Sequence, residues 1–521
     1  MNGAESLLES MGHNGIDVCF ANPGTSEMHF VAALDRNPQV RGVLALFEGV
    51  ATGAADGYSR MLDRPAATLL HLGPGMANGL SNLHNGLRAR SSIVNVIGDH
   101  AGYHRELDAP LTSDIEGAAR PFSDWVRTSP SANTIAADAA DAIGFSRPGR
   151  VASLILPADT AWNPADRIDG TPTAVNPPIQ AIDADLVEAA ARRLETAGSR
   201  TAILLGGRSL RAPQLEIAAR IAEATGASLL AETFAPRTER GEGRHTVTKI
   251  PYPVEPSIAL LRKFDAIVLV DAKPPVAFFA YPDKPSVLTA PGTTFYTVSP
   301  IGSDSLSSLE TLDEAVGRGV SSEDSLLPSF RAEFSPAGLP SGSITAEKLA
   351  AWLSGAVPEN AIVLDESITT GRDFYAQTAQ SRRHDYLGGT GGSIGWALPV
   401  AVGAAVSSPD RKVIALESDG SGMYMPQSLW TYAREQLDIV VLVFANRRYQ
   451  TLRNEMANVG VPEFGPKASS LLDIDQPSID WSALSQSMGV PASRVDTIED
   501  LDRSFASALA DDGPHLIEIV L

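Results

Sequence analysis

The sequence predicts an α/β protein made of three Rossmann-like units, each built on a parallel sheet. Strand-like apolar runs alternate with helical patterns along the whole chain, as in βαβ units. Two segments rich in Pro, Ser, Thr or Asp, residues 163–178 and 320–343, interrupt this alternation and indicate linkers. The expected domains are therefore residues 1–162, 179–319 and 344–521.

Composition agrees with a large enzyme. Of 521 residues, 44% are apolar and only 20% are charged, so the chain can bury large cores. The net charge of −21 is spread along the chain, which argues against partners such as nucleic acid or an anionic membrane. A single cysteine, Cys19, excludes a disulfide within the chain. Neither a spanning apolar run nor a secretory pattern is found, so we expect a cytoplasmic protein.

The first unit is expected to contain five strands followed by turns or helices. These strands should end near Ala21, Phe47, Leu72, Gly98 and Leu156. Glu48 comes directly after the second strand and before a helix rich in small residues. An unpaired buried carboxylate is costly, so Glu48 needs a partner. It is either a satisfied core acid, a helix N-cap partner or a group kept for chemistry.

The middle unit is expected to have four strands. They are Ala202–Leu205, Ser228–Leu230, Ala266–Val270 and Phe295–Val298. Its Gly206-Gly207 turn lacks the full Gly-x-Gly-x-x-Gly fingerprint of a dinucleotide site. We therefore expect a structural role for this unit.

The third unit carries the strongest chemical signal. Asp419 and Asn446, 27 positions apart, each follow an apolar run of strand character. A βαβ unit would place both at the carboxyl ends of adjacent strands, where open parallel sheets bind ligands. Their oxygens suit Mg²⁺, and the helix start at Gly420 and Ser421 favours an anion. The pattern predicts a magnesium and diphosphate site, although an ordinary βαβ unit with an Asp-Gly turn would look the same.

This spacing resembles the motif of the thiamin diphosphate-dependent enzymes, Gly-Asp-Gly and then Asn-Asn about two dozen residues later. Ser418 and Ala445 replace the first Gly and the first Asn of that motif, while Asp419 and Asn446 are kept. The resemblance implies that the carbonyl of Arg448 is the third metal ligand.

Four upstream segments resemble, in order, the pyrimidine-binding domain of the benzoylformate decarboxylase and acetolactate synthase large-subunit branch. They are Phe20–Glu27, Leu44–Gly49, Ala51–Tyr58 and Leu69–Gly75. The resemblance covers essentially the whole chain. It implies a pyrimidine-binding domain, a middle Rossmann-like domain and a diphosphate-binding domain, with FAD unlikely in the middle one.

The resemblance also implies roles for single residues around the cofactor. Glu48 would bind N1′ of the aminopyrimidine and move a proton there. Ile394 would support the bent cofactor, and Gly392 would offer its carbonyl to the 4′-amino group, although a plain core role fits Ile394 equally well. The other implied cofactor-binding residues are Ser367, Thr369, Gly420, Ser421 and Tyr449.

The resemblance is less complete among the residues that would contact the substrate. Thr25 matches a substrate-contacting Ser of benzoylformate decarboxylase, and His71 matches an active-site His, although a core His fits that position too. The second catalytic His has no match, since Phe279 or Tyr281 stands in that region. His100 and His104 could supply a proton instead, or they could be ordinary loop residues. The polar stretch after Tyr449 favours a small or polar 2-oxo acid.

The predicted function is therefore a Mg²⁺- and thiamin diphosphate-dependent enzyme that decarboxylates a 2-oxo acid, with possible carboligation as in acetolactate synthase. Two alternatives stay open: a benzoylformate decarboxylase-type decarboxylase, and a cofactor-binding regulatory paralogue with little catalysis. The resemblance further implies a homodimer or homotetramer whose sites are shared between subunits.

Overall fold

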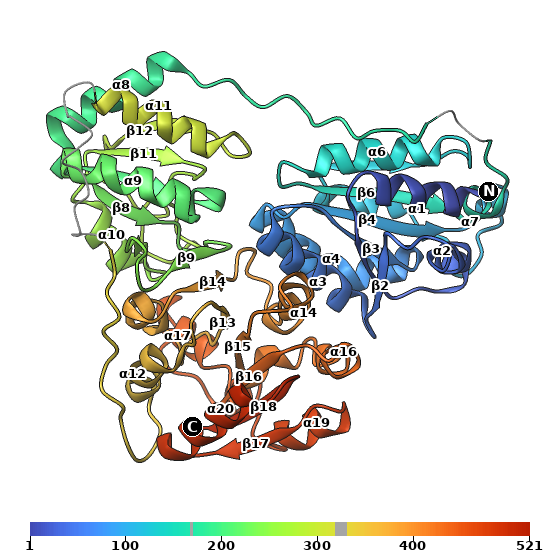
Figure 1. The fold of residues 1–521 in the computed structure, drawn as a ribbon. Helices are drawn as coiled ribbons and strands as arrows, with labels where there is room; N and C mark the ends of the chain where they lie inside the picture. Colours follow the sequence, from blue (N-terminus) through green and yellow to red (C-terminus); the bar gives the residue numbers. More distant parts are fainter. Residues whose placement is uncertain (167–169, 318–330) are drawn as a thin grey trace.

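A computed structural model of the protein describes residues 1–166, 170–317 and 331–521 (Figure 1). Three mostly parallel sheets, each flanked by helices, confirm the predicted α/β class. Residues 167–169 of the first expected linker lie outside the described ranges. So do residues 320–330 of the second linker and the last two positions of the expected middle domain. No helix within the described ranges has the length and apolar character needed to cross a membrane.

The first sheet has the strand order β2-β1-β3-β4-β6-β5, with every pair parallel. Its strands are β1 (Val18–Ala21), β2 (Arg41–Leu44), β3 (Ala66–Leu70), β4 (Ile93–Asp99), β5 (Trp125–Thr128) and β6 (Val151–Pro157). One face packs on α1 (Gly3–His13), α2 (Met28–Leu34) and α6 (Ile135–Ser146). The other packs on α3 (Glu48–Leu62), α4 (Leu72–Ala89) and α5 (Ile115–Ala119). A reciprocal capping box between Asn2 and Glu5 starts α1.

The second sheet has the order β10-β8-β7-β11-β12 and is also parallel. Its strands are β7 (Thr201–Leu205), β8 (Ser228–Ala231), β10 (Thr248–Lys249), β11 (Ala266–Val270) and β12 (Thr294–Ser299). The helices that cover it are α8 (Ala184–Ala197), α9 (Ala212–Thr225), α10 (Val254–Leu261) and α11 (Ser305–Gly317). The four strands expected here are confirmed to within one residue at each end.

The third sheet has the order β17-β18-β16-β15-β13-β14-β9. Its strands are β13 (Ala361–Glu366), β14 (His384–Gly388), β15 (Val413–Ser418), β16 (Ile439–Ala445), β17 (Ala492–Val495), β18 (His515–Val520) and the short β9 (Thr238–Arg240). Helices α12 (Ala346–Ala356) and α20 (Ile498–Ala510) cover one face. Helices α14 (Ala397–Ser407), α16 (Ser428–Glu435) and α19 (Trp481–Ser487) cover the other. Strand β9 comes from the middle of the chain and pairs antiparallel with β14, so it ties two units together.

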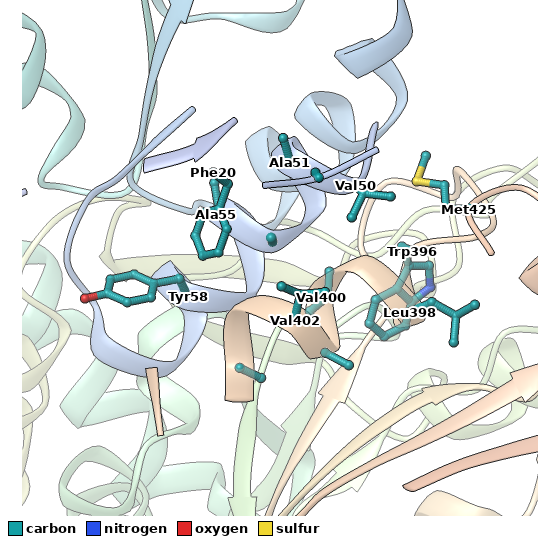
Figure 2. Close-up of a cluster of buried hydrophobic side chains, with 14 of the residues drawn as sticks. Phe20, Val50, Ala51, Ala55, Tyr58, Trp396, Leu398, Val400, Val402 and Met425 are labelled. Atoms are coloured by element: carbon teal, nitrogen blue, oxygen red, sulfur yellow. The ribbon is translucent and has the colours of Figure 1, made fainter. Parts of the chain in front are cut away.

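Helices α3 and α14 join the first and third units into one continuous core. Figure 2 shows the two helices lying against each other within this cluster, with Val50 on α3 and Leu398 and Val400 on α14. The backbones approach closely because glycines line the contact. A Cβ on Gly57 would lie 2.0 Å from the carbonyl oxygen of Val400, and one on Gly403 would lie 1.8 Å from that of Ala54. The small-residue helix predicted after Glu48 therefore serves as a packing face between units.

The expected strand ends need one correction in the first unit. The second strand ends at Leu44, three residues before the predicted Phe47. Residues 45–47 lead from the strand into α3: Phe47 is the N-cap with φ −156°, and Glu48 is the first helical residue. Glu48 therefore stands at a helix N-terminus, where a negative charge is favoured.

Candidate functional site

Asp419 and Asn446 stand at the carboxyl ends of β15 and β16, which are adjacent parallel strands. Asp419 is buried, and its Oδ2 accepts a hydrogen bond from the backbone N–H of Arg447 at 2.5 Å. Asn446 is half-buried, and its Oδ1 accepts from the N–H of Arg448 at 3.0 Å. Burial raises the pKa of Asp419 to about 6. The structure thus brings the carboxylate against the residue that follows Asn446.

The turn after Asp419 is closed by hydroxyl groups that point away from the open edge. Ser418 Oγ donates to the backbone carbonyl of Glu366 at 3.2 Å, so its side chain lies against β13. This explains how Ser418 can replace a glycine without filling the space over the turn. Ser421 Oγ is hydrogen-bonded to Glu417, which leaves the Ser421 backbone N–H as the group available to an anion.

Tyr449 forms the wall beside the same turn. An added Cβ on Gly420 would lie 2.6 Å from Tyr449 Cε1, so the ring packs directly on the glycine. The backbone around Arg448 is fixed by a neighbouring segment, because the N–H of Tyr449 donates to Leu472 at 2.7 Å. The Arg448 side chain is exposed.

Residues 391–397 form the loop that leads into α14. Gly392 has φ +79°, a conformation that favours glycine, and a Cβ there would lie 2.6 Å from Phe278 Cζ. Ile394 is half-buried rather than part of a core cluster. Asn85 holds the same loop from α4: its Nδ2 donates to the carbonyl of Ser393 at 2.9 Å, and its Oδ1 accepts the N–H of Ser393 at 3.2 Å.

Residues 367–371 follow β13 and form a second turn at the same sheet edge. Ser367 is buried, and its hydroxyl donates to Asp365. Thr369 is half-buried and stands beside Ile368, which is 40% exposed. Of the two predicted phosphate-side residues, Thr369 is thus the one whose side chain is more accessible.

Glu48 has the burial that the sequence predicts, with 7% of its surface exposed. Its Oε2 accepts a hydrogen bond from Asn78 Nδ2 at 3.0 Å. A Cβ on Gly75 would lie 2.8 Å from its Oε1, so helix α4 closes tightly over the carboxylate. No cation forms an ion pair with Glu48 within the described part of the chain. Burial of a carboxylate is costly unless a cation or several donors compensate it, and Glu48 has only one neutral donor. A purely structural role therefore explains this residue poorly.

His71 pairs with a carboxylate that the sequence analysis did not single out. His71 is the N-cap of α4, and its Nδ1 lies 2.8 Å from Oε2 of Glu27, which is fully buried. Glu27 also accepts from the N–H of Gly24 at 2.7 Å and from Ser26 Oγ at 2.7 Å. The neighbouring Thr25 is exposed. A carboxylate on Nδ1 fixes the ring orientation and leaves Nε2 as the free nitrogen.

Backbone strain is found in three of these loops. Leu72, Ile368 and Arg447 have φ of 47°, 48° and 58°. Positive φ is uncommon outside glycine, and for a β-branched residue such as Ile368 it is a true outlier. Strained residues of this kind gather at ligand sites, where the surrounding structure enforces them.

Two matches to protein families cover both ends of the chain. The N-terminal TPP binding domain of thiamine pyrophosphate enzymes matches residues 1–117, and the C-terminal TPP binding domain matches residues 370–519. The "Putative acetolactate synthase large subunit IlvX" of Mycobacterium tuberculosis is 46% identical over 100% of this chain and 99% of that protein. The chain belongs to the thiamine pyrophosphate enzyme family.

More distant relatives share the same architecture. Benzoylformate decarboxylase of Pseudomonas aeruginosa is 26% identical over 98% of this chain and 97% of its own. The structure of benzoylformate decarboxylase from Polynucleobacter necessarius superposes with a TM-score of 0.84, at 21% identity, over 100% of this chain and 99% of that one. The Rhodococcus jostii thiamine diphosphate-dependent 4-hydroxybenzoylformate decarboxylase gives 0.82 at 24% identity, over 99% and 98%. These two structural matches establish the fold.

The residues present fit a thiamine diphosphate and Mg²⁺ site of this family. Asp419 and Asn446 offer one carboxylate and one amide oxygen, a hard oxygen set suited to Mg²⁺ together with phosphate oxygens. In the described ranges no cluster of three or more His, Cys, Asp or Glu could hold a metal by itself. Gly392 and Gly420 have no room for a side chain, because Phe278 and Tyr449 already occupy that space.

Sequence reasoning missed three buried carboxylates around the site: Glu27, Glu366 and Glu417. Glu27 is three residues after Gly24 and accepts its N–H, but glycine has no capping side chain, so a capping-box search would not have found it. The other two are visible only through strand register.

The region expected to replace the missing histidine is aromatic. Phe278 packs against Gly392, and its ring centroid lies 4.7 Å from that of Phe279. Tyr281 lies farther along this cluster, 6.5 Å from Phe279, and interacts with Tyr252. The ring centroids of His100 and His104 lie 5.2 Å apart, with the rings tilted by 55°, in the loop after β4.

Proposed function

We propose that the protein is a thiamine diphosphate- and Mg²⁺-dependent enzyme that cleaves the bond next to the carbonyl of a 2-oxo acid. Decarboxylation is the common first step, and the product is either an aldehyde or, after carboligation, an acyloin-type compound. The proposal depends above all on one observation. Asp419 and Asn446 end adjacent strands of the third unit, while the buried Glu48 starts a helix of the first unit.

Each half-site has a distinct task in this proposal. Asp419, Asn446 and the carbonyl of Arg448 hold Mg²⁺, while Gly420, Ser421, Thr369, Ser367 and Tyr449 surround the diphosphate. Glu48 binds the aminopyrimidine and exchanges a proton with it, with Asn78 orienting its carboxylate at 3.0 Å. Ile394 and Gly392 would hold the aminopyrimidine side of the cofactor. The bound cofactor supplies the carbon chemistry, and the protein supplies orientation and electrostatics.

The Glu27–His71 pair is proposed to serve the substrate. With Nδ1 engaged by Glu27, Nε2 of His71 can hold the substrate carboxylate or give a proton to the product. Thr25, exposed two residues before Glu27, would contact the same substrate. No second histidine matches a family position, so His100, His104 or water would complete the proton path.

Two features disagree about the substrate. The stretch 450–455 is polar and favours a small or polar 2-oxo acid, as in acetolactate synthase-like proteins. The Phe278–Phe279 pair beside Gly392 favours an apolar side chain and the benzoylformate decarboxylase-type alternative. Glu48, Asp419 and Asn446 are all present, which argues against the regulatory paralogue.

Turnover of a panel of 2-oxo acids tests the proposal. Pyruvate, other small 2-oxo acids and benzoylformate are each incubated with thiamine diphosphate and Mg²⁺, with and without an acceptor aldehyde. CO₂, free aldehyde and acyloin are scored. We expect CO₂ release that needs both cofactors, with acyloin exceeding free aldehyde when an acceptor is present. Absence of CO₂ with every acid, from protein that binds the cofactor, would instead support the regulatory paralogue.

A further inference from the structure

Two buried glutamates lie side by side behind the proposed cofactor site. Glu366 ends β13, and Glu417 is its register partner on the adjacent parallel strand β15. Their exposed fractions are 4% and 0%. No cationic side chain within the described ranges forms an ion pair with either of them. Two neighbouring carboxylates without a cation are costly to bury, so a function is needed to explain them.

Glu366 binds the loop that contains Gly392 and Ile394. Its Oε1 accepts the backbone N–H of Gly395 at 2.6 Å, and its Oε2 accepts that of Ala397 at 2.7 Å. Both carboxylate oxygens are therefore used on one short segment directly after Ile394. Such charge-assisted bonds are short and strong, and a bidentate pair adds geometric precision.

Glu417 binds the other loop of the site. It accepts the backbone N–H of Ser418 at 2.9 Å and is hydrogen-bonded to Ser421 Oγ, so it fixes the turn that contains Asp419 and Gly420. The two loops also touch directly. Gly395 has φ +83°, and a Cβ there would lie 2.3 Å from Tyr424 Cβ and 3.0 Å from the carbonyl oxygen of Ser421.

Capping of α14 does not by itself account for this arrangement. A carboxylate near a helix N-terminus is favourable, and Glu366 gains that interaction at Ala397. However, helices are usually capped by exposed side chains, which interact with the helix N-terminus in the same way. Such caps do not require a second carboxylate, here Glu417, to be buried beside the first. The pair links two loops whose relative position would set the distance between the aminopyrimidine end and the diphosphate end of the cofactor.

We propose that Glu366 is a positioning residue, which holds the aminopyrimidine-side loop at a fixed place relative to the diphosphate turn held by Glu417. This inference rests on the proposed function, because it assumes that Gly392 and Ile394 meet the cofactor. Glu366 does not touch the cofactor in this role; it acts through the backbone of residues 395–397.

The test separates the two ends of the cofactor by using two probes. Affinities for thiamine diphosphate and for inorganic diphosphate, each with Mg²⁺, are measured by calorimetry on the wild type and on Glu366→Gln. Glutamine keeps the shape but is neutral and offers a single oxygen acceptor, so one of the two N–H groups loses its acceptor and the other loses a charged partner. We expect the thiamine diphosphate Kd to rise roughly 10- to 100-fold, while the Kd of inorganic diphosphate changes by less than about 2-fold.

A second readout reports cofactor geometry rather than affinity. At saturating thiamine diphosphate, exchange of its C2 proton should slow by up to about 10²-fold in Glu366→Gln, since a displacement on the order of 1 Å is enough for this. The near-UV circular dichroism of the bound cofactor should change as well. The midpoint of thermal unfolding without cofactor should not fall, because the substitution removes one of two adjacent buried carboxylates.

Glu518→Gln is the matched control. Glu518 is also buried in the third sheet and accepts a backbone N–H, that of Ser482 at 3.2 Å, but on strand β18. It should behave as wild type with both probes. If Glu366→Gln does not fold, Glu366→Asp is judged by the same criteria.

Two results would overturn the inference. One is that the Glu366 variant binds thiamine diphosphate and exchanges its C2 proton as well as the wild type does. The other is that its affinities for thiamine diphosphate and for inorganic diphosphate fall by the same factor. Wild-type protein that binds neither probe would overturn the proposed function itself, and this inference with it.

Discussion

Asp419 is the side chain on which the proposed cofactor site depends most. Asp419→Ala should still fold but should no longer retain thiamine diphosphate, because the metal loses its one carboxylate ligand. The stabilisation by added cofactor and Mg²⁺, measured as the shift in unfolding temperature, should disappear. Asp480→Ala is the control, since Asp480 caps α19 in the same unit and costs about 1 kcal/mol when lost. Full activity of Asp419→Ala in Mg²⁺ would show that the diphosphate site lies elsewhere.

Because the pKa of Asp419 is raised, the stability of the wild type and of Asp419→Ala should depend differently on pH. The pKa in the folded protein is about 6, against 3.8 for the ordinary side chain. Between these values the folded state binds more protons than the unfolded state, so the stability contributed by Asp419 falls as pH rises. Cofactor-free wild type should therefore lose more stability between pH 4 and pH 6 than Asp419→Ala does. Denaturant titrations at several pH values give the free energy of unfolding of both proteins. If this free energy falls equally with pH in wild type and in Asp419→Ala, the raised pKa does not belong to Asp419.

Glu27 and His71 should act as one unit. His71→Ala should lower turnover yet leave cofactor affinity intact, because His71 is proposed to serve the substrate. Glu27→Gln should also lower turnover, by roughly 10²-fold or less if proton transfer by His71 is impaired but not abolished. The double variant should be little worse than His71→Ala, as expected for coupled groups. Losses in kcat that multiply in the double variant would mean that the two residues act separately.

Single residues differ in how well the sequence reveals them. Asp419, Asn446 and Glu48 each follow an apolar run, so their places at strand or helix ends could be predicted. Glu366 and Glu417 could not, because their pairing depends on which strands are neighbours and in which register. Each looks in the sequence like an ordinary charged residue at the end of a strand.

At the scale of elements, the contact between α3 and α14 should tolerate no added atoms. Gly57→Ala would place a Cβ 2.0 Å from a backbone carbonyl, which cannot move aside as a side chain could. Overpacking of this kind costs about 1–3 kcal/mol, more than the ~1 kcal/mol gained from helix propensity. Gly355→Ala in α12 is the control, because its Cβ would meet the nearest atom at an ordinary 3.4 Å. Urea denaturation should show the first variant destabilised and the second unchanged or more stable.

Element prediction succeeded where strands are buried on both faces. Strands β7 and β11 are near-continuous apolar runs covered by helices on both sides, and the sequence located them to within a residue. Strands β5 and β17 are edge strands of mixed polarity and give no such signal. Strand β9 could not be predicted, because it belongs to the middle of the chain but pairs with the third sheet.

At the scale of the whole molecule, the open question is which Glu48 meets which Asp419. Within one chain, Met425 of the third unit reaches the start of α3: Asn82 Nδ2 lies 3.0 Å from its Sδ, and a Cβ on Gly49 would meet its Cε at 2.6 Å. The family resemblance, in contrast, implies that the two half-sites come from different subunits. A monomer would then lack a complete site, and a symmetric dimer or tetramer would be required.

Mixing two inactive variants decides between these arrangements. Glu48→Gln should bind cofactor but slow exchange of its C2 proton by roughly 10²–10⁴-fold, and Asp419→Ala should not retain cofactor. If sites are shared between subunits, a hybrid dimer contains one site with both wild-type residues and one with neither. Random re-association makes about half of the dimers hybrid, so about a quarter of wild-type activity should return. If each site lies within one chain, every site carries one substitution and activity stays near zero at any mixing ratio.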